Sequence, residues 1–272
     1  KALRRYRIPD DEVLDLAARV RDAGIATVVL QAGEDPAHTT EYICGLVSRI
    51  KAATGLTITL SIGERPYEDY RAFQAAGAER YLLKHETASP ELYRRLHPDS
   101  DQNNRIQCLH WLKGLGYETG AGNMVGLPGQ TLATLADDIL LMRELDIDMI
   151  GIGPFIPHPD TPLKGAAAGD LELVLRVIAI TRLVTGNTNI PATTALAALD
   201  PAIRLKALAS GANVVMPDFT PARYKQHYEI YPGRSGVSSD IKAVLAGLEK
   251  DLSGINRRIG KGPGGRRSRP ED

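Results

Sequence analysis

The sequence is poor in cysteine and aromatic residues, carries no net charge and has no long apolar run. Its 33 basic side chains balance 33 acidic ones, which argues against a general attraction to nucleic acid or to a membrane surface. No apolar run approaches the roughly 20 residues that cross a bilayer, and no secretory signal stands at the start. The sequence therefore predicts a cytoplasmic protein whose partners are neither nucleic acid nor membrane.

The scarcity of cysteine also argues against a disulfide framework. The two cysteines, Cys44 and Cys108, each occur among apolar residues at helical spacing. Such positions are typical of thiols buried on helices rather than of a disulfide or a pair of metal ligands.

What the sequence does contain is a regular alternation of amphipathic segments and short apolar runs. Helical spacing of apolar residues predicts helices at 10–23, 38–53, 66–76, 101–114, 131–145, 170–184, 199–210 and 239–252. Short apolar runs predict strands at 26–30, 56–61, 80–84, 119–125, 149–152, 190–194 and 214–216. Strands that alternate with helices in this way pair in parallel, so the sequence predicts an α/β fold whose sheet is covered by helices.

Polar or glycine-bearing clusters follow nearly every predicted strand, and they help to choose between two architectures. An open doubly wound sheet would concentrate such clusters at one switch point. A closed barrel places them in one ring at the carboxyl ends of all its strands. The sequence thus favours a (β/α)8 TIM-type barrel with seven of eight units visible, missing its first β-strand and the loop that follows it. The clusters lie at 31–35, 61–64, 85–87, 126–130, 154–161, 193–194 and 217–220.

The same pattern predicts three regions along the chain. Residues 1–236 form the barrel. Residues 237–254 form an amphipathic helix that packs on the barrel. Residues 255–272, which are rich in glycine and arginine, form a disordered tail.

The stretch from Gly116 to Thr131 holds five glycines around a short hydrophobic run. Glycine weakens a strand, but it has no Cβ and tolerates close contact with a ligand. We interpret this stretch as a strand whose backbone a ligand approaches closely.

Two charged residues each allow a functional and a structural interpretation. Glu86, after the strand 80–84, could accept hydrogen bonds from a ribose or an ammonium group, or it could cap the next helix together with Thr87. Arg105 could form a surface ion pair or present its planar donors to a ligand carboxylate. Spacing alone does not decide between these interpretations.

Two further strand-end loops have distinctive compositions. Four prolines stiffen residues 154–162, which suits the rim of a pocket, and His158 and Asp160 in this loop are too few for a metal site. Thr193 and Thr194 could hold a small anion or polar substrate, or they could satisfy backbone groups of their own loop.

Several segments together resemble one family. They resemble the HydE family of FeFe-hydrogenase maturases, which belongs to the radical S-adenosylmethionine (SAM) superfamily, in the branch with biotin synthase and methylornithine synthase. The resemblance runs from about Arg5 to Gly236. The segments that carry it are 30–36, 80–88, 117–131, 151–163, 189–195, 211–217 and 231–233.

The resemblance implies a barrel that binds SAM, with a 4Fe-4S cluster that reduces SAM to a 5'-deoxyadenosyl radical, and a role in assembling the diiron site of FeFe hydrogenase. It also implies a small-molecule substrate and, as partners, other hydrogenase maturases. By likeness to the family, the residues that bind SAM would be Glu86, Arg105, Gln31, Gly122, Met124 and Gly126. The residues that line a substrate or anion cavity would be Thr59, Lys84, Thr193, Thr194, Met216 and Tyr231.

The sequence departs from the family pattern in three places. Gln130 stands near the position where relatives often have glutamate, and Lys84 stands where arginine is expected. The chain also has no Cys-x3-Cys-x2-Cys loop, and Cys44 and Cys108 have neither the number nor the spacing for three iron ligands. In the family this loop follows the first strand, so the sequence predicts that the chain as given holds no metal and is inactive by itself.

Three alternatives to a maturase stay open at this point. A methylornithine-synthase-like radical SAM mutase would share the barrel. A non-catalytic barrel would bind SAM or a small anion. A conventional barrel aldolase would use Lys84 as a Schiff-base nucleophile.

Overall fold

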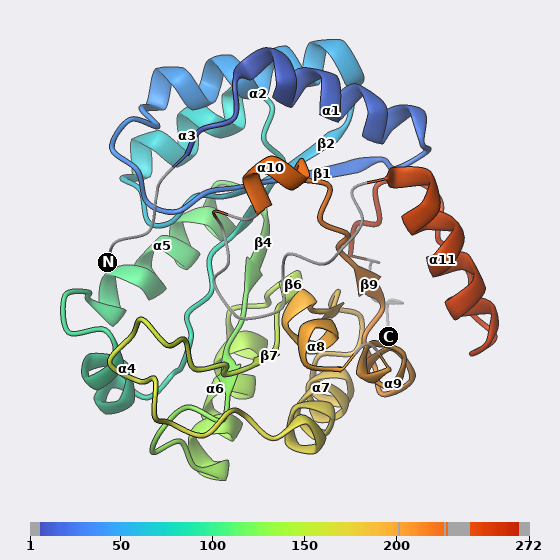
Figure 1. Ribbon diagram of the computed structural model, residues 1–272. Helices are drawn as coiled ribbons and strands as arrows, with labels where there is room; N and C mark the ends of the chain where they lie inside the picture. The colour runs from blue at the N-terminus through green and yellow to red at the C-terminus, as the bar shows by residue number, and fades with distance from the viewer. Residues whose placement is uncertain (1–5, 201, 226, 228–239, 267–272) are drawn as a thin grey trace, which may run out of the picture.

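The computed structural model describes residues 6–200, 202–225, 227 and 240–266. Parallel strands lie inside a surrounding set of helices (Figure 1). One sheet pairs, in order, β1 (Thr27–Gln31), β2 (Thr57–Ser61), β3 (Arg80–Leu82), β4 (Glu118–Ala121) and β6 (Met149–Ile150). A bridge between Met149 and Asn189 leads from β6 toward β8 (Pro191–Ala192), which pairs with β9 (Val214–Val215). The predicted succession of parallel strands is confirmed.

Two of the predicted strands differ in detail from the structure. The predicted strand 119–125 divides into β4 and β5 (Met124–Val125), and the chain after β6 pairs again at β7 (Gly153–Pro154). β5 and β7 pair with each other in parallel. The break lies where two backbones approach closely, because a Cβ added to Gly122 would lie 2.1 Å from the carbonyl oxygen of Gly151.

Several helices begin at a side chain that accepts backbone N–H groups of the first turn, whereas the helices that begin at Asp10, Tyr67, Thr194 and Ile203 (α1, α3, α8 and α9) have no such cap. Thr39, Asp101, Thr131 and Asp170 are such caps. None of the helices within the described ranges combines the length and the hydropathy that a membrane span needs. The helices are α1 (Asp10–Asp22), α2 (Thr40–Thr54), α3 (Tyr67–Ala75), α4 (Pro90–Leu96), α5 (Gln102–Gly114), α6 (Leu132–Glu144), α7 (Leu171–Thr185), α8 (Thr194–Leu199), α9 (Ile203–Ala209), α10 (Ala222–Lys225) and α11 (Ile241–Ser253).

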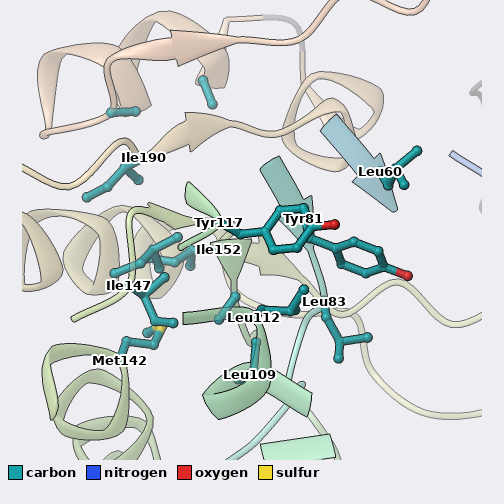
Figure 2. Packing of buried hydrophobic residues seen from close by; sticks show 14 of the residues in the cluster. Leu60, Tyr81, Leu83, Leu109, Leu112, Tyr117, Met142, Ile147, Ile152 and Ile190 are labelled. Atoms are coloured by element: carbon teal, nitrogen blue, oxygen red, sulfur yellow. The ribbon is translucent and has the colours of Figure 1, made fainter. Parts of the chain in front are cut away.

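The main core fills the space between the strands and the helices (Figure 2). Tyr81 of β3 is fully buried, and its ring meets the rings of Tyr70 and Tyr117 edge-on at 5.0 and 6.1 Å. Its hydroxyl donates a hydrogen bond of 2.8 Å to the carbonyl oxygen of Gly63. A buried tyrosine that finds an acceptor in this way contributes its apolar area without an unpaired hydroxyl.

Both cysteines are free thiols on helices, as the sequence predicted. Cys108 of α5 is buried and Cys44 of α2 is half-buried. Burial raises the pKa of both thiols, so both favour the neutral form over the thiolate that binds metals.

The segment after α11 differs from the predicted disordered tail at residues 255–266, while residues 267–272 of that prediction lie outside the described residues. Residues 255–266 lie against the amino ends of the strands, where the carbonyl oxygen of Pro263 accepts hydrogen bonds from Thr27 and Arg80 at 2.9 and 2.8 Å. The glycines next to Pro263 have no side chains to shield the backbone, so its carbonyl groups are accessible to hydrogen-bond donors. Composition alone did not predict these hydrogen bonds.

Arg266 anchors the end of this segment. Its guanidinium pairs with Asp146 at 2.7 Å and with Asp148, just before β6, at 3.2 Å. The Arg266 side chain is 11% exposed, so the two carboxylates hold a largely buried cation. The segment thus covers the end of the barrel opposite to the strand-end loops.

Candidate functional site

Glu86 follows β3 at the carboxyl ends of the strands and has an unusual backbone. Its φ angle is +69°, its N–H donates to the carbonyl oxygen of Gly122 at 3.0 Å, and its own carbonyl oxygen accepts from Met124 at 3.1 Å. Its carboxylate oxygen Oε2 is buried and has no hydrogen-bond partner within the described part of the chain. A buried acceptor left unpaired in this way suits a ligand that donates hydrogen bonds.

The alternative role of Glu86 and Thr87 as helix caps is wrong. Ser89 caps α4, because its hydroxyl accepts from the N–H of Leu92 at 3.3 Å. Thr87 instead accepts from the N–H of Ser89 within the loop at 3.3 Å.

Arg105 of α5 reaches into the same region and is not in a surface ion pair. It donates to the hydroxyl of Tyr93 at 2.9 Å and to the carbonyl oxygen of Lys84 at 3.1 Å, and it pairs with Glu64 at 2.9 Å. Burial opposes its charge, but Tyr93 and Glu64 outweigh burial and raise the pKa of Arg105. Arg105 therefore stays a cation at the strand ends, and the carbonyl group that it binds, that of Lys84, lies two residues before Glu86.

His97, at the end of α4, lies in the electrostatic field of the same two groups. Burial lowers the pKa of His97, Glu86 opposes this shift and Arg105 adds to it. The imidazole is therefore neutral at pH 7. Its centroid lies 4.8 Å from that of the Tyr93 ring with the two planes tilted by 34°, and the hydroxyl of Tyr93 accepts a hydrogen bond from Arg105.

Two glycines of the stretch from Gly116 to Thr131, Gly122 and Gly126, make room for other backbone segments of the protein. A Cβ on Gly122 would meet Gly151, and a Cβ on Gly126 would lie 2.3 Å from the Cα of Gly169. Gly126 also has a φ angle of +91°, which favours glycine. Close backbone packing is thus sufficient to explain both glycines.

Gln130 closes the same loop. Its Oε1 accepts from the N–H groups of Gly126 at 2.7 Å and Leu127 at 3.3 Å, and its Nε2 donates to the carbonyl oxygen of Met124 at 2.8 Å. Only an amide both accepts and donates in this way, because an ionised glutamate has no N–H. Gln130 thus holds the shape of the loop.

Four of the predicted site residues line one cavity of about 1250 Å³. The cavity extends between β1, β9, α1 and α11, and its walls include part of the segment 255–266. The four residues are Gln31, Thr59, Thr194 and Met216.

Two of the other residues predicted for the substrate cavity, Lys84 and Thr193, are not part of its lining. The side chain of Lys84 passes the backbone of Gly151, where an added Cβ would lie 3.2 Å from Cε of Lys84. The hydroxyl of Thr193 is buried with no partner among the described residues, so it does not satisfy its own loop. Tyr231 lies outside the described residues.

The proline-rich loop shows a local contact in place of a metal site. Nδ1 of His158 accepts a hydrogen bond from the N–H of Asp160 at 3.1 Å. Within the residues that the structure describes, no three His, Cys, Asp or Glu side chains come together to hold a metal ion.

Sequence reasoning missed several residues that shape the site. Glu64 and Tyr93 hold Arg105, and a buried pair, Asn123 and Asp138, lies beside the Glu86 loop. The sequence could have indicated that Asp138 is buried, because Asp138 follows Leu135 by three residues and therefore falls on the apolar face of α6.

Comparisons with known proteins show the class of protein to which this fold belongs. The model of the Radical SAM superfamily matches residues 2–142. The chain belongs to this superfamily of enzymes, whose members use SAM and a 4Fe-4S cluster.

Similarity to one relative identifies the family to which the chain belongs within this superfamily. The chain is 48% identical over 267 residues to the [FeFe] hydrogenase maturase subunit HydE of Thermotoga maritima, covering 98% of this chain and 76% of that one. It therefore belongs to the HydE family of hydrogenase maturases.

More distant relatives share the barrel. The 3-methylornithine synthase of Methanosarcina acetivorans is 28% identical over 250 residues, which is 91% of this chain and 71% of that one. A crystal structure of methylornithine synthase superposes with a TM-score of 0.80 at 26% identity, over 95% of this chain and 75% of that one. The maturase HydG of Carboxydothermus hydrogenoformans, at 19% identity and a TM-score of 0.75, shares the fold over 93% of this chain and 60% of its own.

The superfamily uses two groups, SAM and a 4Fe-4S cluster, and the residues present fit only SAM. The unpaired carboxylate oxygen of Glu86 suits the hydroxyl donors of the SAM ribose. The thiols do not fit a 4Fe-4S cluster, because the chain has only two cysteines, on different helices, and burial keeps both protonated.

Proposed function

We propose that this chain is the SAM-binding barrel of a HydE-type maturase that acts on a small molecule in assembling the diiron site of [FeFe] hydrogenase. The observation that carries the proposal is the buried, unpaired carboxylate oxygen of Glu86 beside the charged Arg105. The 48% identity to the HydE of Thermotoga maritima supports the maturation role. Other hydrogenase maturases would be its partners in that process.

The residues of the chain would each bind or orient one part of SAM. Glu86 and Arg105 would hold the ribose and methionine ends, and the backbone around Gly122, Met124 and Gly126 would lie beside the adenine. Gln31 ends β1 and lines the cavity of about 1250 Å³, whose lining does not include the other five residues, so Gln31 would contact SAM from the cavity side. The bound cofactor supplies radical chemistry in this superfamily.

The small-molecule substrate would occupy the interior cavity. Thr59, Thr194 and Met216 line its wall. Thr193 precedes Thr194 in the chain but is not part of that lining, and its unpaired hydroxyl would bind an anionic or polar group of the substrate. Lys84, whose stem passes Gly151, would add a positive charge. Membership of the superfamily replaces the interpretation of Lys84 as an aldolase nucleophile.

Calorimetric titration of SAM into the chain tests the proposal. The wild-type chain is expected to bind, and Glu86→Gln is expected to bind about tenfold to a hundredfold more weakly, because a hydrogen bond to a charged group contributes roughly 1.5–3 kcal/mol. Glu91→Gln, an exposed glutamate of α4, is the matched control. Absence of binding by the wild-type chain, or equal binding by Glu86→Gln, contradicts the proposed site.

A methylornithine-synthase-like mutase is the second candidate. The TM-score of 0.80 to methylornithine synthase favours it, whereas the 28% identity to the relative of Methanosarcina acetivorans, against 48% for HydE, weighs against it. A hybrid in which this chain is joined to the cluster-binding segment of a HydE relative, expressed in a strain that lacks its own HydE, would favour the maturase by restoring hydrogenase maturation. Restoring methylornithine synthesis instead would favour the mutase.

A further inference from the structure

A fully buried polar cluster lies beneath the strand-end loops. His85 after β3, Asn123 between β4 and β5, and Asp138 of α6 have no exposed surface. A buried carboxylate is costly unless hydrogen bonds compensate for the lost water. The contacts of Asp138 therefore decide what the cluster does.

Both oxygens of the Asp138 carboxylate accept hydrogen bonds, each from a different loop. Oδ1 accepts from the backbone N–H of Ala88 at 2.5 Å, and Oδ2 accepts from the side-chain amide of Asn123 at 2.9 Å. His85 lies nearby, with Nε2 3.7 Å from Oδ1. Asp138 thus joins the loop after β3 to the turn between β4 and β5.

Glu86 lies in the first of these loops and is bonded to the second. Its N–H and carbonyl oxygen pair with Gly122 and Met124, the two neighbours of Asn123. Its φ angle of +69° is uncommon for a residue with a side chain and persists only when the surroundings determine it. Asp138 holds a residue on each side of this arrangement, Ala88 and Asn123.

We propose that Asp138 is a positioning residue that holds the Glu86 carboxylate in the geometry that binds the SAM ribose. The inference rests on the proposed function. It requires a carboxylate at position 138, because both partners of Asp138 are N–H donors. An asparagine would turn its own NH2 group toward one of these donors and lose that bond.

The first test compares SAM affinity in Asp138→Asn with Asp137→Asn, its exposed neighbour on the same helix. Asp138→Asn is expected to raise the Kd about tenfold, and Asp137→Asn to leave it unchanged. The calorimetric stoichiometry reports the folded fraction, so a loss of folded protein is separated from a change in the site. Wild-type affinity in Asp138→Asn overturns the inference while leaving the proposed function intact.

A double-mutant cycle separates positioning from general destabilisation. If Asp138 acts through Glu86, then Asp138→Asn has no further effect on SAM affinity in a Glu86→Gln background. A tenfold loss in both backgrounds overturns the inference.

A reciprocal exchange keeps the test decisive even if Asp138→Asn folds poorly. In Asn123→Asp with Asp138→Asn, the amide of residue 138 donates to the carboxylate of residue 123 and its oxygen accepts from Ala88, so both bonds return. Wild-type affinity is expected in the exchange, and an affinity tenfold weaker in folded protein overturns the inference. Absence of SAM binding by the wild-type chain overturns the proposed function and this inference together.

Discussion

Replacing Gly122 with alanine tests whether the glycine stretch serves packing or ligand contact. The added Cβ would lie 2.1 Å from the carbonyl oxygen of Gly151 and 2.8 Å from its carbonyl carbon. These are backbone atoms, so β4 and β6 would have to separate by about 1 Å to restore an ordinary contact. The hydrogen bond from Gly151 to Ala121, 2.9 Å long, spans the same place and would be strained.

The expected loss in the free energy of unfolding is about 2–4 kcal/mol. Overpacking a core site contributes roughly 1–3 kcal/mol, and weakening one backbone hydrogen bond contributes roughly 0.5–1.5 kcal/mol. For a chain of this size the loss corresponds to a fall in Tm of about 4–16 °C.

Urea unfolding and thermal scans measure the effect, and Gly45→Ala is the control. Gly45 lies exposed within α2 with open space around it, so alanine there is expected to stabilise the chain by about 0.5–1 kcal/mol. If Gly122→Ala unfolds like the wild type but loses SAM binding, the packing argument is refuted and the glycine serves the ligand.

Three further predictions concern the loop, the barrel end and pH. Gln130→Glu is expected to destabilise the chain by about 1–3 kcal/mol in urea, because a carboxylate oxygen would face the carbonyl of Met124; an unchanged midpoint would contradict this role. Arg266→Ala is expected to lower stability by about 1–2 kcal/mol and to expose the 255–266 segment to proteases, and a wild-type digestion pattern would count against the anchoring of this segment. Because the folded chain lowers the pKa of His97 below the ordinary 6.5, the unfolded chain binds the proton more readily, so stability is expected to fall as pH drops through 6.5. His97→Asn should flatten that dependence in urea unfolding between pH 7 and 5, and an unchanged slope would show that other groups cause it.

Local patterns determined the succession of elements. Helical spacing placed Cys44 and Cys108 on helices, where Cys108 is buried and Cys44 half-buried, and alternating runs predicted the parallel strands. These signals are readable because a helix or strand buries a face that recurs within a few residues of the chain. The likeness of long segments was likewise sufficient to indicate the family.

Long-range contacts decided the roles of individual side chains. No spacing in the sequence shows that Arg105 pairs with Glu64, 41 residues away, or that Asp138 accepts from Ala88, 50 residues away. Composition suggested a disordered tail, yet Arg266 meets Asp146 across 120 residues of chain.

The sequence by itself therefore determined the α/β barrel and the superfamily, since each depends on local periodicity or on segment likeness, and it predicted the candidate residues. Only the tertiary structure showed that the missing side chain of Gly122 leaves space for the backbone of Gly151, and that one carboxylate oxygen of Glu86 is buried without a hydrogen-bond partner among the described residues. The physical reason is that a side chain acquires its role from the atoms around it, and folding brings those atoms from distant parts of the chain.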